Sequence, residues 1–221
     1  MKLKGKIERP VILLGAGGHA KVLLSLLLHN NMTLIGVCDP GLAEQGSEYW
    51  RDIPVLGGDD AIMSFDSDDV WLVNGVGQLP RSTLRQQLFE RFQQCGYYFP
   101  PLVHSFAWVD PSADLKAGAQ IMAGAVVQAD CVIGENTIVN TNAGVDHDCQ
   151  IGANVHIAPG VTLCGHVQIG AQAFVGSGST IIQGLSVGSA SVVGAGTTLV
   201  RDLEVGYLAI GATGKARALR K

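Results

Sequence analysis

The stretch VNTNAGVDHDCQIGANVHIAPGVTL at residues 139–163 has an aliphatic residue at every sixth position, from its first residue to its last. The same spacing runs without interruption through 17 consecutive positions between Val109 and Val205. Four residues after most of these positions stands a small side chain, such as Ala119 or Cys149. A six-residue period matches neither the 3.6-residue helix nor the alternation of a single strand, so it indicates internal repeats.

Each hexad is expected to form one short strand and one turn, with the aliphatic side chain inside and the small one where the turn narrows the interior. Three hexads would close one triangular coil, and coils would stack at the strand spacing of ~4.8 Å. The 17 hexads therefore predict between five and six coils, a prism roughly 27 Å tall. Residues that tolerate unusual backbone angles stand near the expected turns: Gly134, Gly152, Asn154, Gly170 and Gly188.

The first hundred residues lack this period and alternate between strand-like and helix-like segments. The expected strands are 11–14, 34–38 and 70–73, and the expected helices are 20–29 and 81–95. Such alternation is typical of a small parallel α/β unit, here of the Rossmann-like type. The predicted fold is therefore mixed, with an α/β domain at 1–100 and a parallel β-helix of hexapeptide repeats at 101–221.

The first expected strand ends in a glycine-rich turn, Gly15-x-Gly17-x-x-Ala20, that leads into the first helix. Glycines let the backbone approach a phosphate closely, and a helix N-terminus presents bare N–H groups to an anion. Asp39 ends the next strand, where an acidic side chain often meets a ribose or a base. Two interpretations stay open, a nucleotide phosphate site and a mere tight turn. The unit is too short for a two-half dinucleotide domain, so a mononucleotide or nucleotide-sugar fits better than NAD.

The composition argues against several partners. The formal net charge is −4 and the pI is about 5.8, so no nucleic-acid surface is expected. The longest apolar run, at 22–28, is too short to span a bilayer, so no membrane is expected as a partner. The five cysteines show no CxxC spacing, which predicts reduced thiols and a cytoplasmic location.

One of the six histidines differs from the others in its surroundings. His147 occupies a hexad position that points away from the core, and it lies between Asp146 and Asp148. A carboxylate beside an imidazole fixes its tautomer and raises its basicity. The sequence therefore indicates His147 as a general base.

The run NTNAGVDHDC at 140–149, followed by HIAPG at 156–160, resembles the sialic-acid O-acetyltransferase (NeuD-like) family of hexapeptide-repeat sugar acyltransferases. That family includes the bacillosamine and perosamine N-acetyltransferases. The similarity extends to GAGGH at 15–19 and NGVG at 74–77 and covers nearly the whole chain. It implies a left-handed coil, against the usual right-handed crossover. It also implies acetyl-CoA as cosubstrate without a metal, and a homotrimer with the acetyl donor between adjacent prisms.

The resemblance further implies roles for single residues. His147 corresponds to the catalytic base, and Asp148 to the acidic residue that orients it. His156 would lie near the thioester of the donor, and the backbone N–H of Gly165 would point toward the thioester carbonyl. The other expected contacts are Ser177 and Ala195 to the pantetheine arm, and Gly15, Gly17, Gly18, His19, Asp39 and Gly77 to the nucleotide-sugar.

The chain departs from the family pattern in two places. The family usually ends in Gly-x-Pro-Ala-Lys, where this chain has Gly211-Ala-Thr-Gly-Lys215, so the end of the coenzyme site differs. His104 lacks the usual following proline, which concerns packing more than chemistry.

Other functions remain open at this stage. A metalloenzyme like the gamma-class carbonic anhydrases would need three suitably spaced imidazoles, but His147, His156 and His166 include no His-x₄-His pair. A non-catalytic nucleotide-sugar-binding protein is a second alternative. Among acetyltransferases, N-acetylation of a nucleotide-linked amino-sugar is favoured, because the glycine loop and Asp39 imply a nucleotide on the acceptor. O-acetylation of sialic acid or a related sugar is the alternative.

Overall fold

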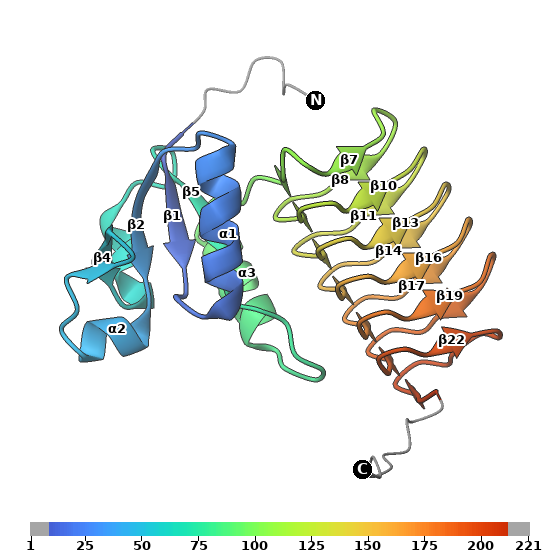
Figure 1. Ribbon diagram of the computed structural model, residues 1–221. Coiled ribbons are helices and arrows are strands. Elements are labelled where there is room, and N and C mark those ends of the chain that lie inside the picture. Colours follow the sequence, from blue (N-terminus) through green and yellow to red (C-terminus); the bar gives the residue numbers. More distant parts are fainter. Residues whose placement is uncertain (1–8, 212–221) are drawn as a thin grey trace, which may run out of the picture.

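The computed structural model describes residues 9–211 and shows an α/β unit beside a triangular prism of stacked coils (Figure 1). The N-terminal sheet has the order β3-β4-β2-β1-β5 and is parallel except for the β3–β4 hairpin. Its strands are β1 (Val11–Leu14), β2 (Leu34–Cys38), β3 (Tyr49–Trp50), β4 (Ile53–Gly57) and β5 (Trp71–Asn74). The helices of this unit are α1 (Gly18–His29), α2 (Pro40–Glu44), the 3₁₀ helix η1 (Asp59–Ser64) and α3 (Leu84–Gln94).

The predicted alternation of strand and helix is confirmed. The first two strands have the expected bounds, and β5 begins one residue later than expected, at Trp71. Every residue of β1 is buried because it lies in the middle of a sheet covered on both faces. The β3–β4 hairpin was not predicted. Its turn contains Arg51 and Asp52, whose φ angles of 50° and 65° are left-handed. An arginine rarely adopts this conformation, so the sequence contains little indication of a turn here.

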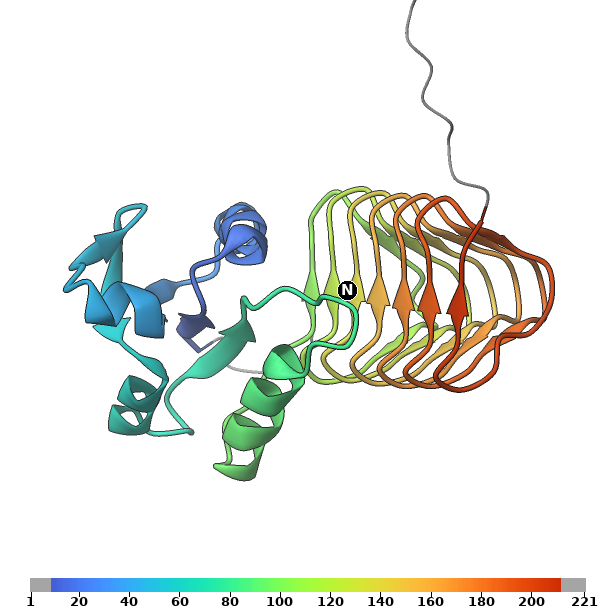
Figure 2. The same cartoon turned by 90° about the horizontal axis from the view of Figure 1, so that it is seen from below.

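The prism has three flat faces of parallel strands. Face 1 contains β7, β10, β13, β16, β19 and β22; face 2 contains β8, β11, β14, β17 and β20; face 3 contains β6, β9, β12, β15, β18, β21 and β23. Successive strands of a face pair with partners three hexads further on, as Val127 does with Val145. Figure 2 shows the resulting coils stacked one behind another from the green to the red end.

In chain order the prism strands are β6 (Leu102–Val103), β7 (Trp108–Val109), β8 (Asp114–Leu115), β9 (Gln120–Ile121), β10 (Val126–Val127), β11 (Val132–Ile133), β12 (Ile138–Val139), β13 (Gly144–Val145), β14 (Gln150–Ile151), β15 (His156–Ile157), β16 (Thr162–Leu163), β17 (Gln168–Ile169), β18 (Phe174–Val175), β19 (Thr180–Ile181), β20 (Ser186–Val187), β21 (Val192–Val193), β22 (Thr198–Leu199) and β23 (Leu208–Ala209).

The interior of the prism is filled by the two residues of each hexad that the period identified. The aliphatic positions from Ile121 to Leu199 are at most 6% exposed, and the small residues Cys131 and Cys149 are fully buried. Where the small residue is Thr137, its hydroxyl donates to the carbonyl of Gly152 at 2.8 Å. A buried polar group is tolerated inside an apolar core when it is hydrogen-bonded in this way.

The six-residue register is wrong at the last coil. Val187 pairs with Leu203, and Val193 pairs with Ala209, so this coil is shorter than three full hexads. Val205, expected in the core, is 69% exposed. The shorter turn is stabilised by Asp202, whose carboxylate accepts a hydrogen bond from the backbone of Ser186 at 2.8 Å, which the hexad pattern does not encode.

The role predicted for the turn glycines is also partly wrong. Asn154 has the expected left-handed φ of 58°, and this turn position is left-handed in nearly every coil. The glycines Gly134, Gly152, Gly170 and Gly188 are not left-handed, and they stack at the corner between faces 2 and 3. A Cβ at these four positions would come closer than 3.0 Å to backbone in the next coil. They are needed for close approach of coils rather than for their backbone angles.

The N-terminal unit packs on face 3. Met122 and Ile138 of that face belong to the same apolar cluster as α1 and β1. Arg85 of α3 is 1% exposed and donates to the carbonyls of Asn136, Asn74 and Val76. Burial lowers the pKa of Arg85 to about 9. The contact is therefore both apolar and hydrogen-bonded.

The domain limits of 1–100 and 101–221 stay a proposal, which the change of regular structure near residue 100 supports. Tyr98 still bridges to Trp71 of the N-terminal sheet, and β6 begins the prism at Leu102. Among residues 9–211, none of the helices has the length and apolarity that crossing a membrane would require. The altered motif at 211–215 lies outside the described residues except for Gly211.

The glycine corner gives a stability prediction. Gly152→Ala would bring a Cβ within 2.7 Å of the backbone nitrogen of Ala171, and overpacking of this kind costs about 1–3 kcal/mol of unfolding free energy. Gly144→Ala is the matched control, because a Cβ there meets no atom within 4 Å and Gly144 has no left-handed φ. Denaturant unfolding at one protein concentration should show a lower midpoint for Gly152→Ala alone. Equal losses in both variants would contradict the close-packing argument.

Candidate active site

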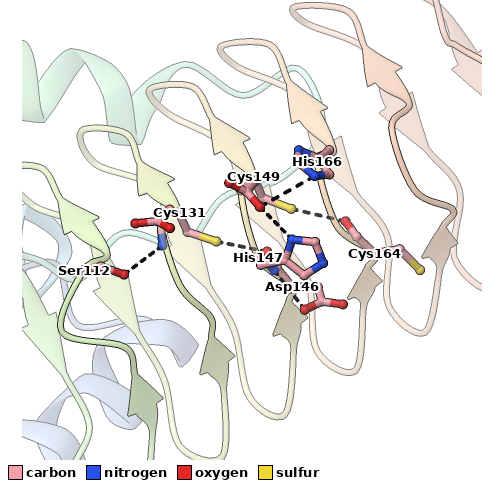
Figure 3. Close-up of polar contacts among 9 residues, drawn as sticks. Ser112, Cys131, Asp146, His147, Cys149, Cys164 and His166 are labelled. Atoms are coloured by element: carbon pink, nitrogen blue, oxygen red, sulfur yellow. Dashed lines mark hydrogen bonds and ion pairs between the residues drawn. The ribbon is translucent and has the colours of Figure 1, made fainter.

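His147 lies in the turn after β13, at the corner between faces 1 and 2 (Figure 3). The Asp146 carboxylate accepts a hydrogen bond from the backbone N–H of His147 at 2.8 Å, which braces the turn. Asp148 occupies the left-handed position of the turn, with φ 59°, and its Oδ2 lies 2.7 Å from His147 Nδ1. The His147 side chain is 52% exposed, so the imidazole is accessible from solvent.

The electrostatics of this corner favour a base. The hydrogen bond to Asp148, together with the charges of Asp146 and Asp148, raises the pKa of His147 above its ordinary value. Because the carboxylate can only accept, Nδ1 carries the ring proton in the neutral imidazole, and Nε2 keeps its lone pair. The geometry therefore presents Nε2 as the proton acceptor.

Gly165 lies one coil below His147, at the same corner. A Cβ at Gly165 would lie 2.7 Å from both Cε1 and Nε2 of His147, so the missing side chain leaves room for the imidazole. Within residues 9–211, the backbone N–H of Gly165 donates no hydrogen bond. A free N–H donor thus lies on the coil directly beneath the reactive edge of the imidazole.

Ser177 and Ala195 stand at the equivalent turn position, two residues after an aliphatic core residue, but on the corner between faces 3 and 1. In the described part of the chain their backbone N–H groups also make no hydrogen bond, and both residues are exposed. Free N–H donors in successive coils fit the amide carbonyls of an extended pantetheine arm. Within one chain, however, these donors and Gly165 lie on different corners.

His156 lies in β15 on face 3, rather than beside His147. It is 7% exposed, and its ring stacks on Phe174 with a centroid distance of 4.9 Å and an interplanar angle of 12°. Burial, with smaller effects from the charges of His19 and Arg85, lowers its pKa to about 3. His156 is therefore neutral and faces the N-terminal unit.

The glycine loop lies at the carboxyl ends of β1 and β5, which are neighbours in the sheet. Gly15 has a left-handed φ of 85°, and a Cβ at Gly75 would lie 2.6 Å from the carbonyl of Leu14. Gly17 is the N-cap residue of α1 and has no side chain that could bond to the first N–H groups of the helix. A Cβ built on Gly17 or on Gly18 would meet no neighbouring atom within 4 Å. The bare N–H groups of this helix end, next to open space, fit a phosphate.

The remaining acceptor residues are held from both units. His19 Nε2 lies 2.7 Å from Oε1 of Gln120 on β9, and burial lowers the pKa of His19 to about 4. A Cβ at Gly77 would lie 3.4 Å from the Cβ of His19, so the two loops are adjacent. Asp39 accepts hydrogen bonds from the backbone of Ala16 at 2.9 Å and of Leu42 at 3.0 Å. Its carboxylate therefore positions the glycine loop, and its predicted contact with a ribose stays a prediction.

Sequence reasoning missed Gln120 and Arg85, which join the loop to the prism. Gln120 is 1% exposed on an outward strand position of face 3, and its amide donates to the carbonyl of Asn74 at 2.9 Å. Its neighbours in the same column are the apolar Leu102 and Ile138. A single amide side chain among apolar residues at the same outward hexad position is the sequence signal that could have identified Gln120.

Comparisons with known proteins agree with this fold. The protein-family model described as the PglD N-terminal domain matches residues 10–92. Two family models of transferase hexapeptide repeats match residues 130–165 and 166–201. A crystal structure of a perosamine N-acetyltransferase variant from Caulobacter crescentus, in complex with CoA and GDP-perosamine, is 34% identical. The match covers 95% of this chain and 97% of that one with a TM-score of 0.84.

The acetyltransferase domain of PglB from Neisseria gonorrhoeae, in complex with acetyl coenzyme A, is 33% identical. The match covers 91% of this chain and 96% of that domain, with a TM-score of 0.82. This chain belongs to the hexapeptide-repeat sugar acetyltransferases. The family resemblance read from the sequence is thereby confirmed, and so is the left-handed parallel β-helix. WeeI from Acinetobacter baumannii, 22% identical over 92% of this chain and 97% of its own with a TM-score of 0.82, shares the fold. No curated protein sequence matched the chain.

The dyad of this acetyltransferase gives a prediction of pH dependence. The pKa of His147 is raised by Asp148, so His147 is protonated and inactive as a base up to a higher pH than an isolated imidazole. Asp148→Asn removes the charge and should move the acid limb of the kcat/KM profile to lower pH. Rates of acetyl transfer between pH 5 and 9 measure this shift. An unmoved acid limb, or one moved to higher pH, would show that Asp148 does not set the basicity of His147.

Proposed function

We propose that this chain transfers the acetyl group of acetyl-CoA to the amine of a nucleotide-linked amino-sugar, with His147 as general base. The observation that carries the proposal is the His147–Asp148 hydrogen bond at 2.7 Å above the free N–H of Gly165. It occurs in a chain that is 34% identical, over 95% of its length, to a perosamine N-acetyltransferase. That relationship also favours N-acetylation over O-acetylation.

In the proposed mechanism His147 Nε2 accepts a proton from the sugar amine while the amine nitrogen attacks the thioester carbon. The Gly165 N–H stabilises the negative charge that develops on the carbonyl oxygen. The C–N bond forms, the C–S bond breaks, and His147 returns its proton to the leaving sulfur. Asp148 holds the imidazole in the tautomer that starts this sequence. Base catalysis of this kind contributes about 10²- to 10⁴-fold to the rate.

The acceptor is proposed to bind through its phosphates at the N-terminus of α1. Gly17 and Gly18 leave this helix end open, and its first turn contains no acidic side chain that would repel an anion. His19 and His156 are neutral, so they would act as hydrogen-bonding groups rather than as charges, His19 toward the nucleotide-sugar and His156 near the thioester of the donor.

The active enzyme is proposed to be a homotrimer, built from three copies of the 23.1 kDa chain. His147 lies on the corner between faces 1 and 2, and the glycine loop lies over the opposite face 3. Donors for the coenzyme are likewise divided between two corners. A neighbouring chain that brings its own corner to face 3 would complete each site, which a cyclic trimer achieves for all three chains.

We also propose a cytoplasmic location. The five cysteines are unpaired, which suits a reducing compartment. The proposed cosubstrate is made and used inside cells.

The experiment that tests the activity is a panel of UDP-, GDP- and dTDP-linked amino-sugars against free sugars, with labelled acetyl-CoA. Label should enter a nucleotide amino-sugar as an amide. Transfer only to free sialic acid or a related hydroxyl would support O-acetylation instead. Binding of nucleotide-sugars without any transfer would indicate a non-catalytic binding protein.

Removal of the base should abolish most of the rate. His147→Ala is expected to lower kcat by at least ~10²-fold, because it removes the proton acceptor. Asp148→Asn should cost less, because it leaves Nε2 in place. Circular dichroism checks that the prism is intact, since both side chains are exposed at a turn. Turnover of His147→Ala close to that of the native enzyme would exclude this mechanism.

Shared sites predict complementation between two inactive variants. Gly17→Val blocks the acceptor loop, where a side chain meets no protein atom, and His147→Ala removes the base. In mixed trimers made by co-expression, about a quarter of the sites would combine an intact loop with an intact base from the neighbour. Acetyl transfer should therefore recover to roughly that fraction. No recovery in mixed trimers, or a fully active monomer by light scattering, would show that one chain holds a complete site.

A further inference from the structure

His166 takes no part in the proposed reaction, yet it lies against the catalytic dyad. It occupies the left-handed turn position one coil below Asp148, with φ 59°. Its Nε2 lies 3.6 Å from Asp148 Oδ2, and its ring meets that of His147 at 89° with a centroid distance of 5.2 Å. Figure 3 shows the imidazoles of His147 and His166 at this corner, and Asp148 Oδ2 lies within 3.6 Å of a ring nitrogen of each.

We propose that His147, Asp148 and His166 form a binding site for a transition-metal ion such as Zn²⁺, and that the bound ion inhibits acetyl transfer. One ligand atom from each residue lies within 4.8 Å of the other two. Two imidazole nitrogens and one carboxylate oxygen form a donor set that occurs in zinc sites, whereas Mg²⁺ and Ca²⁺ prefer oxygen donors alone.

Two of the three donor separations lie near those around a tetrahedral ion, and the third, between the two imidazole nitrogens, is within 4.8 Å. With metal–ligand bonds of about 2.0–2.2 Å, donor atoms around zinc lie about 3.4 Å apart. The separations of 2.7 Å between His147 Nδ1 and Asp148 Oδ2, and of 3.6 Å between Asp148 Oδ2 and His166 Nε2, lie on either side of this value. The ion would take the place of the proton that Nδ1 now shares with Asp148. The fourth position would face solvent, as in open zinc sites.

The backbone beneath all three ligands is held by the coil ladder. The N–H of His166 donates to the carbonyl of His147 at 2.9 Å, and the N–H of Asp148 donates to the carbonyl of Ala129 at 2.9 Å. The three side chains are 52%, 43% and 65% exposed, so an ion can reach them from solvent. Binding would order side chains only, which lowers its entropic cost.

The inhibition follows from the chemistry of imidazole and rests on the proposed function. A neutral imidazole carries one ring proton. When a metal occupies Nδ1 of His147, that proton resides on Nε2, which then donates instead of accepting. The ion is thus no cofactor. It switches off the base that the reaction needs.

The test combines calorimetry with activity on native enzyme first treated with EDTA and dialysed. Native enzyme should bind one Zn²⁺ per chain and lose acetyl transfer as the site fills. His166→Asn should bind zinc at least about tenfold more weakly, since loss of outer-shell partners alone costs 10- to 100-fold. Asparagine tolerates the left-handed φ, so the turn and the metal-free activity should be unchanged. His29→Asn, which removes an exposed histidine elsewhere, is the matched control and should bind zinc like the native enzyme.

Equal zinc affinity in the native and His166→Asn enzymes, or no binding to either, would overturn the site. One Zn²⁺ bound per native chain with acetyl transfer undiminished would overturn the inhibition. Calorimetry, and the visible spectrum of Co²⁺ used in place of zinc, report on the site even if no sugar acceptor is acetylated. Failure of the proposed function is therefore distinguishable from failure of this inference.

Discussion

The constraint on which the prism depends is the parallel hydrogen-bond ladder between coils, in which each strand pairs with the strand three hexads away. Every inward side chain therefore stacks on a residue at the same hexad position, and every turn lies directly above the next turn. A period of three hexads converts a one-dimensional pattern into columns. Burial of the two inward positions of each hexad drives the coil closed, while the corner positions are free to hold polar and charged side chains.

The residues of the proposed mechanism lie at these corners. His147 stacks over Gly165, so its imidazole lies against a residue without a side chain. Asp148 stacks over His166 for the same reason. At the corners of the regular coils, the residue two positions after the aliphatic one has a backbone N–H that lies outside the hydrogen-bond ladder. This N–H makes no hydrogen bond at Gly165, Ser177 and Ala195 within residues 9–211, whereas at His147 it donates to the Asp146 carboxylate. The scaffold thus provides repeated, rigid donors at fixed spacing, and a few side chains decide which of them serve a ligand.

The N-terminal unit follows a different rule. Its glycine loop lies where parallel strands end and a helix begins, which is where α/β units bind anions. What joins it to the prism is a buried polar network rather than apolar packing alone. Gln120 contacts His19, and Arg85 donates to three carbonyls while its charge meets no carboxylate among the described residues. Leaving such a group without its carbonyl partners would be costly, so the network holds the loop in one orientation to face 3.

The sequence by itself determined the prism, its hexad register from Val109 to Leu199, the neighbouring α/β unit, and the adjacency of His147 and Asp148, which the proposed mechanism uses. These follow from local periodicity and from adjacent residues, which a linear pattern records directly. Tertiary structure alone decided the last coil, where the turn is shorter, Asp202 stabilises it by a hydrogen bond, and Val205 is exposed. It also decided that His156 faces the N-terminal unit while His147 lies on the opposite corner, and that His166 meets Asp148. Those relations depend on which columns share a corner and on which face the second unit covers. Both are settled by long-range packing and hydrogen bonds between residues far apart in the chain.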